Sequence, residues 1–323
     1  MSRTIAVADI GGTHARFALA EVADGRVMSL AEPVTLKTSD HASFQIAWQE
    51  FGRIAGVDLP DALAMAFAGP VGGDSLKLTN NPWVIRPFLM KERLGVGEYK
   101  IVNDFGAVAH AVAQFGPEHF EHLYGPEGPM PESAVTSVIG PGTGLGVAQL
   151  LKTGAGYHVI ETEGGHIDFA PLDALEDKIL VHLRQSFGRV SIERIVGGVG
   201  IVNLYRAIAS IEGQAVQHPD DKAVWSAALD GSDPLAVAAL DRFFLSMGAV
   251  TGDLALAHGS NAVVIAGGLG YRLRDRFATS GFADRYIAKG RFERRMEGIP
   301  VKLLNHPQPG LYGAAAAFAQ EFA

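Results

Sequence analysis

Hydrophobic positions in the first third of the chain recur with two periods, one typical of strands and one typical of helices. Alternating or β-branched runs bounded by glycine and proline predict strands at residues 4–10, 15–21, 62–68 and 100–103. The first two flank Gly11-Gly12 as the arms of a hairpin would. Helical spacing predicts one helix capped by Ser39 or Asp40 and a second over residues 105–115. The apolar positions of these helices are Phe44, Ala47, Trp48, Phe51 and Ile54 in the first, and Ala107, Ala111 and Val112 in the second.

The same order of elements returns later in the chain. Strands predicted at residues 135–139 and 147–151 bracket a second glycine turn, and Gly12-Thr13 aligns with Gly142-Thr143. This faint repeat predicts two related α/β halves. Further elements are expected as helices at 172–187, 235–258 and 310–322, and as a strand at 262–266. The pattern indicates a mixed α/β protein with open sheets, in which the Gly/Pro-rich residues 125–131 are the best candidate for a break in packing.

Composition limits the class of protein. With 323 residues, of which 48% are hydrophobic and 19% charged, the chain suits a globular protein of two domains. A formal net charge of -8 argues against a nucleic-acid partner, because the phosphate backbone requires a cationic face. The basic run is expected to form a solvated helical face; it consists of Arg285, Lys289, Arg291, Arg294 and Arg295.

Cysteine usage and hydropathy bear on location. The chain has no cysteine, which excludes disulfides and cysteine-ligated zinc and fits a reducing compartment. Residues 1–4 lead directly into the first strand without an apolar signal core, and no apolar run is long enough to cross a bilayer. We therefore expect a cytoplasmic protein without a membrane partner.

Glycine turns after strands supply candidate phosphate sites. Glycine lets backbone N–H groups approach an anion closely, and a threonine hydroxyl adds another donor. Asp9, at the end of the first strand, is suited either to hold Mg²⁺ through water or to cap the turn. Each turn alone is a weak signal, whereas together they favour a nucleotide. The turn residues are Gly11, Gly12, Thr13, Gly142, Thr143 and Gly144, with Gly267 and Gly268 as a third glycine pair.

Other phosphate-binding motifs are missing from the sequence. There is no G-x-x-x-x-G-K-[ST] loop and no dinucleotide-binding glycine fingerprint, which disfavours a Rossmann dehydrogenase. Residues 104–106 spell the Asp-Phe-Gly of protein kinases, but the H-R-D loop and its glycine-rich partner are absent, so this match is accidental.

Asp104 is the candidate general base. Phosphoryl transfer to a sugar hydroxyl requires a carboxylate within hydrogen-bond reach of the attacking oxygen. The alternative role is capping the helix that begins at Phe105. Asn103 beside it and the glycine turns on either side favour the catalytic interpretation, because an adjacent amide and carboxylate can bind neighbouring hydroxyls of one ring.

Polar residues farther along the chain are candidate sugar ligands. Glu163 and His166 flank the pair Gly164-Gly165, and Glu193 offers a further hydroxyl acceptor. The alternatives are a solvated surface turn for the first two and a surface ion pair for Glu193. A metal site of His158, Glu163, His166 and Asp168 is the least favoured interpretation, because no helix presents two of them on one face.

Six ordered motifs resemble those of the bacterial glucokinase family, over the length from the N-terminus to Leu311. They are residues 9–13 (DIGGT), 78–83 (LTNNPW), 103–105 (NDF), 142–146 (GTGLG), 163–171 (EGGHIDFAP) and 191–194 (SIER). The resemblance implies an actin-like, ribonuclease-H-like fold of two α/β domains with a cleft between them. It also implies an ATP-dependent kinase that, with Mg²⁺, phosphorylates D-glucose at the 6-hydroxyl at the entry to glycolysis, and that forms a homodimer. Residues 1–114 with 305–323 are expected to form the smaller domain, and residues 115–304 the larger one.

The resemblance also implies roles for individual residues. Asp104 corresponds to the base. The residues that correspond to glucose ligands are Asn103, Asp104, Glu163, His166 and Glu193. The residues that correspond to nucleotide-binding positions are Ala8, Asp9, Ile10, Gly11, Gly12, Thr13, Gly142, Thr143, Gly267 and Gly268. One departure is Gly197-Gly198-Val199-Gly200, where the family commonly has Ser-Gly-Pro-Gly, so this loop is expected to be more mobile here.

Rival functions remain open at this point. A kinase for another hexose would use the same groups. A sugar-responsive regulator of the same fold needs a DNA-reading module, and the chain moves directly into the first strand. A filament-forming ATPase would keep the nucleotide turns but would not need Asn103, Glu163 and His166. The other large family of bacterial sugar kinases carries a cysteine-rich zinc motif, which this chain lacks.

Overall fold

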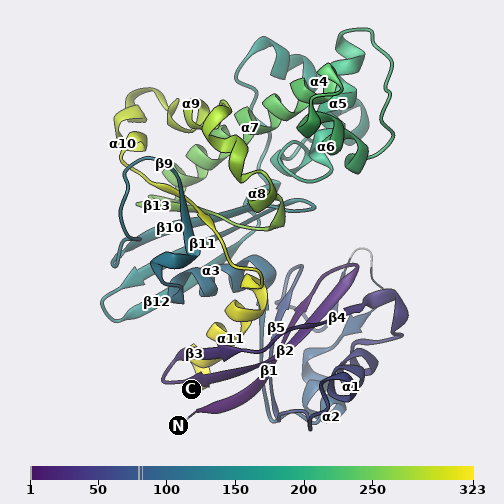
Figure 1. The fold of residues 1–323 in the computed structure, drawn as a ribbon, viewed down its shortest axis with the longest axis vertical. Helices are drawn as coiled ribbons and strands as arrows, with labels where there is room; N and C mark the ends of the chain where they lie inside the picture. The colour runs from purple at the N-terminus through teal and green to yellow at the C-terminus, as the bar shows by residue number, and fades with distance from the viewer. Residues whose placement is uncertain (1, 79–80, 82) are drawn as a thin grey trace. The chain divides into compact units, whose positions relative to one another are not determined.

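The computed structural model describes residues 2–78, 81 and 83–323, which form two compact units. Unit 1 comprises residues 1–116, 159–161 and 306–323, so both chain ends belong to it (Figure 1). Unit 2 comprises residues 117–158 and 162–305. The domain boundaries expected at 114/115 and 304/305 stay a prediction, because a compact unit need not fold independently. Residues 79, 80 and 82 of the LTNNPW motif lie outside the described residues.

Unit 1 is built on a sheet of six strands in the order β3-β2-β1-β5-β8, with β4 paired to β2. β1 and β2 form the predicted antiparallel hairpin, and β5 and β8 extend the sheet in parallel. A separate short hairpin joins β6 to β7. The strands are β1 (Arg3–Ile10), β2 (His14–Ala23), β3 (Arg26–Leu30), β4 (Val34–Lys37), β5 (Ala62–Phe67), β6 (Leu76–Lys77), β7 (Val84–Ile85) and β8 (Glu98–Asn103).

Helices cover both faces of this sheet, because its central strands alternate apolar side chains between the two faces. Ile5 and Val7 contribute to the core on one face, and Ala6, Ala8 and Ile10 to the core on the other. The first core includes residues of α3 and α11, and the second includes residues of α1 and α2. The helices are α1 (Phe44–Ala55), α2 (Met90–Leu94), α3 (Asp104–Gln114) and α11 (Pro309–Phe322).

Unit 2 has its own six-stranded sheet, in the order β12-β11-β10-β13-β14-β9. Its antiparallel hairpin β10–β11 is followed by β13 and β14 in parallel, while β9 closes the edge in the antiparallel sense. The strands are β9 (Phe120–Tyr124), β10 (Ala134–Pro141), β11 (Leu145–Thr153), β12 (Gly156–Thr162), β13 (Ala262–Ile265) and β14 (Val301–Leu304). Residues 159–161 of β12 are the part of this sheet that belongs to unit 1. Residues 125–131, the expected break in packing, form the connection between β9 and β10 inside this unit.

The helices of unit 2 share one hydrophobic core with the sheet. They are α4 (Ala174–Phe187), α5 (Gly200–Ile211), α6 (Asp221–Asp230), α7 (Pro234–His258), α8 (Gly268–Arg272), α9 (Phe282–Ile287) and α10 (Glu293–Glu297). The expectation that no run is long enough to cross a membrane is wrong for α7. Within the part of the chain that the structure describes, α7 alone is long and apolar enough to do so, and most of its residues are buried in this core. The expected helices at 172–187, 235–258 and 310–322 correspond to α4, α7 and α11.

The predicted internal repeat is confirmed by the order of strands. In each unit an antiparallel hairpin, β1–β2 or β10–β11, lies beside two further strands in parallel, β5 and β8 or β13 and β14. Each of the two aligned glycine turns joins the two strands of its own hairpin, β1 to β2 and β10 to β11. The mixed α/β architecture with open sheets is confirmed as well.

Two details of the first predicted helix are wrong. The cap of α1 is Ser43, whose side chain accepts a hydrogen bond from the Ile46 N–H, whereas Ser39 and Asp40 lie in a short 3-10 turn before it. Phe44, Ala47, Trp48 and Phe51 are buried as expected, but Ile54 is exposed. Three potential capping residues lie within five positions, and only the one adjacent to Phe44 has the geometry that reaches the first turn.

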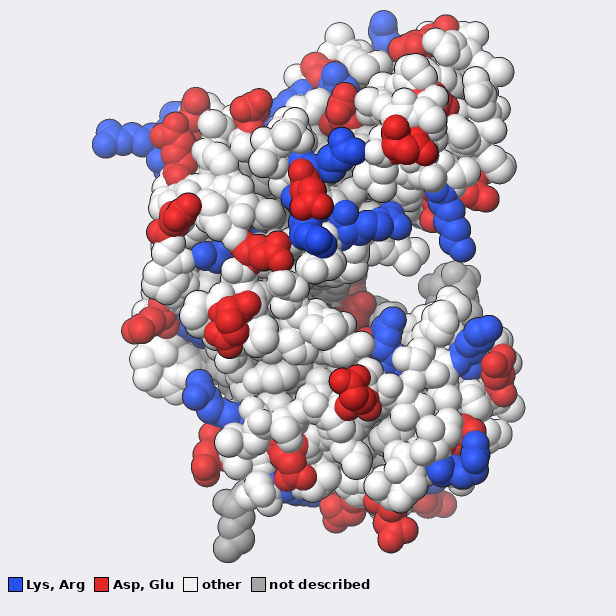
Figure 2. Space-filling view, in the orientation of Figure 1, with Lys and Arg blue, Asp and Glu red and all other residues white. Residues whose placement is uncertain are grey.

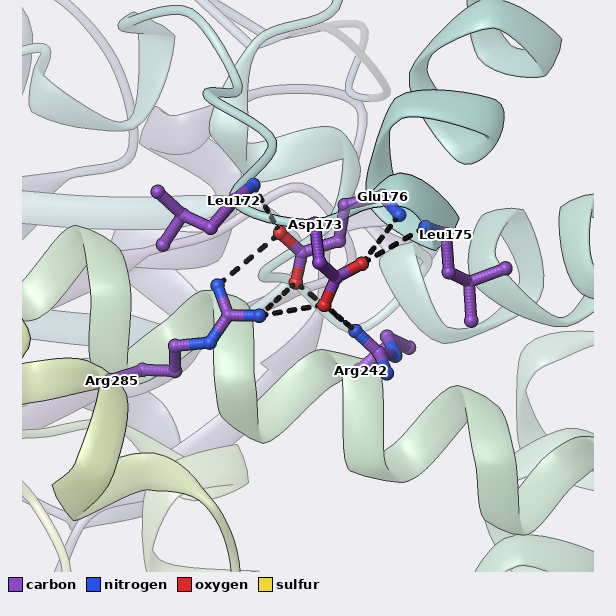
Figure 3. Close-up of polar contacts among 6 residues, drawn as sticks. All are labelled: Leu172, Asp173, Leu175, Glu176, Arg242 and Arg285. Atoms are coloured by element: carbon purple, nitrogen blue, oxygen red, sulfur yellow. Dashed lines mark hydrogen bonds and ion pairs between the residues drawn. The ribbon is translucent and has the colours of Figure 1, made fainter.

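The start of α4 is fixed by a cluster of four charged side chains, which we call the α4 anchor: Asp173, Glu176, Arg242 and Arg285 (Figure 3). Asp173 caps α4 by accepting from the N–H groups of Leu175 and Glu176. It also binds Arg242 of α7 and, at 2.7 Å, Arg285 of α9. Although desolvation opposes the change, the hydrogen bonds from the Glu176 N–H and Arg242 hold the pKa of Asp173 below its ordinary value. Three helices are thereby tied together by charge.

The α4 anchor corrects the expectation that the basic run is a solvated face. The Arg285 side chain is 16% exposed and ion-paired, and Lys289 is 8% exposed, paired with Asp253 at 2.8 Å. Arg291, Arg294 and Arg295 are exposed as expected. Over the face drawn in Figure 2, basic and acidic side chains are interspersed. Spacing along the chain therefore did not reveal which cations of the run have buried partners.

Candidate functional site

The first glycine turn joins β1 to β2 in unit 1. The Gly11 N–H donates to the His14 carbonyl at 3.0 Å, and the Thr38 hydroxyl donates to the Gly12 carbonyl at 2.9 Å. Thr13, the threonine of the motif, is exposed, and its carbonyl accepts the Thr38 N–H at 3.0 Å. Thr38, the residue after β4, thus fixes the turn by two hydrogen bonds, while Thr13 at the tip of the turn faces solvent. This is a suitable geometry for backbone donors to meet an anion.

Asp9 lies at the end of β1 next to this turn. Its carboxylate is 25% exposed and lies 3.4 Å from Arg16, the residue opposite it on β2. Burial raises the pKa of Asp9, and the Arg16 guanidinium opposes that rise. A Cβ at Gly310 would come within 3.1 Å of this carboxylate, so glycine lets α11 begin close to it. A partly exposed carboxylate oxygen beside a phosphate-type turn fits the ligand preference of Mg²⁺.

Asn103 and Asp104 occupy the junction between β8 and α3. Asn103 caps the helix: its Oδ1 accepts from the Phe105 N–H at 2.9 Å and the Gly106 N–H at 3.2 Å. Asp104 is the first residue of α3, and its Oδ1 also lies 2.9 Å from the Phe105 N–H. The alternative role of Asp104, capping the helix, therefore belongs mainly to Asn103. The Asn103 Nδ2 donates to the Gly69 carbonyl at 3.3 Å, so the junction is fixed on both sides.

Glu161 supports this junction and was not singled out from the sequence. Its Oε1 accepts the Asn103 N–H at 2.7 Å, and a Cβ at Gly106 would lie 2.5 Å from the same oxygen. Gly106 therefore has no side chain where the Glu161 carboxylate lies. No local pattern could have indicated this contact, because Glu161 is 58 residues from Asn103 in the sequence and lies on β12 outside the six motifs.

In unit 2, His166 and Glu193 lie side by side. Their Nδ1 and Oε1 atoms are 3.8 Å apart, and the side chains are 59% and 20% exposed. Two backbone hydrogen bonds join their segments, from the Ile192 N–H to the Ile167 carbonyl at 2.8 Å and from the Phe169 N–H to the Val190 carbonyl at 2.9 Å. Two residues that are distant in the sequence are thus brought together with hydrogen-bonding groups at the surface. This pairing suits neighbouring hydroxyls of a sugar.

Glu163 directly precedes the short 3-10 turn Gly164–His166. Gly165 in this turn touches β11 so closely that a Cβ would lie 2.1 Å from the Leu145 carbonyl. After the turn, Arg189 donates to the His166 carbonyl at 2.5 Å and pairs with Asp168 at 2.7 Å. Among the described residues no group of three potential metal ligands occurs, and Asp168 has Arg189 as its partner. Arg189 is a second residue that the sequence did not single out.

The second glycine turn, residues 142–144, lies between these candidate sugar ligands and a cavity. A Cβ at Gly144 would lie 2.5 Å from the Glu193 Oε2, so the carboxylate lies directly on the turn. The Gly142 N–H donates to the Gly144 carbonyl at 2.9 Å. Gly142 and Thr143 line a cavity of about 590 Å³ together with Gly268. Its other lining residues include Lys222, Trp225 and Arg272, from α6 and α8.

The loop Gly197-Gly198-Val199-Gly200 packs against the same turn. The Gly198 N–H donates to the Gly142 carbonyl at 2.6 Å, and the Gly198 carbonyl accepts from the Trp225 Nε1 at 2.9 Å. A Cβ at Gly197 would lie 2.9 Å from the Thr143 carbonyl. Glycine is thus required for close approach of two backbones. The greater mobility expected for this loop stays a prediction.

Comparison with known proteins bears on the family of the chain. The family model described as Glucokinase matches residues 6–321. The chain belongs to the glucokinase family. It is 58% identical over 318 residues to a glucokinase of Zymomonas mobilis, with 98% of each chain covered. A crystal structure of a glucokinase from an Antarctic psychrotroph superimposes with a TM-score of 0.84 at 32% identity, covering 97% of this chain and 98% of that one.

A more distant structural relative supports the fold alone. A ROK-family glucokinase from Streptomyces griseus, solved in complex with glucose and AMPPNP, has a TM-score of 0.61 at 21% identity, covering 98% of this chain and 99% of that one. The expected actin-like fold class is therefore confirmed, as is membership in the glucokinase family.

Within each unit, some of the predicted site residues lie beside one another. In unit 1, Asp9 adjoins the first glycine turn, and Asn103 adjoins Asp104. In unit 2, Glu193 contacts both His166 and Gly144. Gly267, at a positive φ of 88°, lets the chain turn from β13 into α8, where Gly268 reaches the cavity. Lys222, Trp225 and Arg272 were not predicted, because three side chains from two helices carry no shared spacing in the sequence.

The helix that begins at Asp104 carries a pH-dependent group. His110 is buried on α3, and burial, with a smaller effect of Lys100, lowers its pKa to about 4 from 6.5. The unfolded chain binds this proton below pH 6.5 and the folded chain only near pH 4, so stability is lost as pH falls through this window. We expect the wild type to lose about 2 kcal/mol more than His110→Gln between pH 7.5 and pH 5.0 in urea unfolding.

The matched control for this prediction is His122→Gln, which changes an exposed histidine on β9. Its loss of stability over the same pH range should equal that of the wild type. If His110→Gln and the wild type lose stability equally, burial of a neutral His110 does not contribute to acid sensitivity.

Proposed function

We propose that this chain transfers the γ-phosphate of ATP to the 6-hydroxyl of D-glucose, giving glucose 6-phosphate and ADP. The observation that carries the proposal is the contact of Glu193 with both His166 and Gly144, which sets candidate sugar ligands directly on a phosphate-type turn. Membership in the glucokinase family supports both the reaction and the substrate. A kinase for another hexose and a sugar-responsive regulator are not favoured by these relatives.

Asp104 is proposed to accept the proton of the 6-hydroxyl as that oxygen attacks the γ-phosphorus. A carboxylate fixed at the start of a helix is held in one orientation, which lowers the entropy cost of aligning it with a hydroxyl. The other glucose hydroxyls are proposed to bind Asn103, Glu163, His166 and Glu193. A pocket built to hydrogen-bond a hydroxyl can reject a sugar that lacks it by roughly 10⁴-fold in kcat/KM, so these groups would select glucose among hexoses.

The nucleotide is proposed to bind the glycine turns. Backbone donors of residues 8–13 and of Gly142 and Thr143 would meet the phosphates, and Gly267 and Gly268 would adjoin the nucleoside. When bound, Mg²⁺ neutralises charge on the transferred phosphate, and Asp9 would hold it through water. Exclusion of water on closure would protect the phosphate from hydrolysis. A cytoplasmic homodimer is the expected state of the protein.

A coupled assay tests the proposal. Purified protein with ATP, Mg²⁺ and D-glucose should form glucose 6-phosphate, with mannose, fructose and N-acetylglucosamine run in parallel. Turnover on glucose alone supports both reaction and pocket. Turnover on a different hexose would support the proposed reaction and contradict glucose as the substrate. The absence of turnover on every sugar would contradict the proposal that the protein is a sugar kinase.

A further inference from the structure

A cation–π pair of side chains lies in the wall of the 590 Å³ cavity. Arg272, the last residue of α8, holds its guanidinium 5.2 Å from the centre of the Trp225 ring. Trp225 is buried and fixed, since its Nε1 donates to the Gly198 carbonyl and Phe243 packs edge-on at 5.2 Å. Arg272 itself is exposed, and its side chain forms no hydrogen bond or ion pair with any residue in the described ranges. The guanidinium therefore lies over a rigid indole, and no described carboxylate holds its N–H groups.

We infer that Arg272 is the platform for the nucleotide base: the adenine of ATP stacks on the guanidinium face opposite Trp225. The inference rests on the proposed function, because it names the part of the nucleotide that this side of the cavity binds. An arginine guanidinium is planar, delocalised and weakly hydrated, so it stacks on aromatic faces where a lysine ammonium does not. Nucleic acid bases stack on arginine planes in the same way. Trp225 holds the plane in place before the base arrives, which reduces the ordering cost of binding.

Contacts in the wall favour the base over the phosphates as the partner of Arg272. Gly142, at the phosphate-type turn, accepts from the Gly198 N–H, and Gly198 in turn accepts from Trp225. Arg272 joins this series of contacts through Trp225 and lies one helical turn beyond Gly268. The cavity is within the usual size range of small-molecule sites, so it has room for more than a triphosphate.

Lys222 gives the cavity a second cation with different chemistry. It lines the same wall from α6, and its ammonium is a compact point charge that suits a phosphate oxygen. The two cations therefore have distinct roles in the inference, with Lys222 toward phosphate and Arg272 toward the base.

Titration calorimetry on Arg272→Ala tests the inference with three probes: ADP, adenosine and inorganic tripolyphosphate. Loss of base stacking should raise the Kd of ADP and of adenosine roughly tenfold, and should change the Kd of tripolyphosphate by less than about twofold. Arg272→Lys keeps the charge without the plane and should bind adenosine as weakly as Arg272→Ala. The melting temperature of each variant is measured alongside to show that it is folded.

Arg274→Ala is the matched control. Arg274 stacks on Tyr271 at 4.4 Å in the neighbouring turn but does not line the cavity, so all three Kd values should equal those of the wild type. If Arg272→Ala raises the Kd of tripolyphosphate as much as that of ADP and leaves the Kd of adenosine unchanged, Arg272 binds phosphate and the inference is wrong. It is also wrong if no probe is affected, or if the wild type binds neither ADP nor adenosine. A wild type that binds ADP but forms no glucose 6-phosphate would refute the proposed function and leave this test valid.

Discussion

Replacing Asp104 by asparagine should lower kcat by at least about 10³-fold, which is within the range that a positioned general base contributes. Asparagine keeps the size of the side chain and an oxygen that can face the Phe105 N–H, but it cannot accept the hydroxyl proton. Because Asn103 carries the helix cap, α3 should begin at the same residue in the variant. The expected signature is a large loss of kcat with Kd values for ADP and glucose within a few fold of the wild type.

Steady-state kinetics and calorimetry together check this expectation. Asp40→Asn is a suitable control, because it removes an exposed carboxylate at a 3-10 turn of the same unit and should leave kcat unchanged. A variant that loses ADP binding and kcat in parallel would indicate a folding defect. Retention of more than about a tenth of the wild-type kcat would show that Asp104 is not the base.

The hairpins and their glycine turns were predictable because each depends on residues that are close in the sequence. Alternation around Gly11-Gly12 and around Gly142-Thr143 places both hairpins correctly, and the alignment of the two turns predicts the shared strand order. The types of the neighbouring residues were not sufficient to predict which residue caps each helix. Asn103 rather than Asp104 caps α3, since the residue that leaves the strand in extended conformation has its side chain over the first N–H groups.

The candidate site was predictable as a set of residues but not as an arrangement. Glu163, His166 and Glu193 could be identified from sequence, whereas the contact of Glu193 with Gly144 depends on packing of segments 49 residues apart. Glu161, Arg189 and Arg272 could not be identified, because each acts on a partner supplied by another segment. A charged residue without periodic neighbours looks the same in sequence whether it is solvated or fixed by a partner.

The basic run shows this limit most clearly. Arg285 and Arg291 are six residues apart and equally cationic, yet Arg285 contacts Asp173 and Glu176, more than one hundred residues earlier in the chain. Arg291 is exposed, and its guanidinium lies 5.1 Å from the ring of its neighbour Phe292. The two residues therefore make a matched pair for measuring what the α4 anchor contributes.

Arg285→Ala should lower the free energy of unfolding by about 3 kcal/mol or more, while Arg291→Ala should change it by less than about 0.5 kcal/mol. The α4 anchor holds two carboxylates and two guanidinium groups, so removing one cation leaves an uncompensated negative charge. That charge would fall mainly on Glu176, which is 2% exposed. Among the residues that the structure describes, its Oε1 has no hydrogen-bond partner and has ion pairs at 3.5 Å to Arg285 and 3.6 Å to Arg242. Breaking a buried ion pair from one side is costly for this reason.

Urea unfolding of both variants measures the difference directly, and a second substitution tests its cause. Adding Glu176→Gln to Arg285→Ala removes the uncompensated charge while an amide oxygen can still accept the Leu172 N–H, which donates to Glu176 at 2.7 Å in the wild type. The double variant should therefore be more stable than Arg285→Ala alone, even though it carries one more change in a buried position. If Arg285→Ala is no less stable than Arg291→Ala, the α4 anchor does not hold the three helices together. If the double variant is less stable than the single one, the cost of losing Arg285 comes from lost packing and not from an unpaired charge.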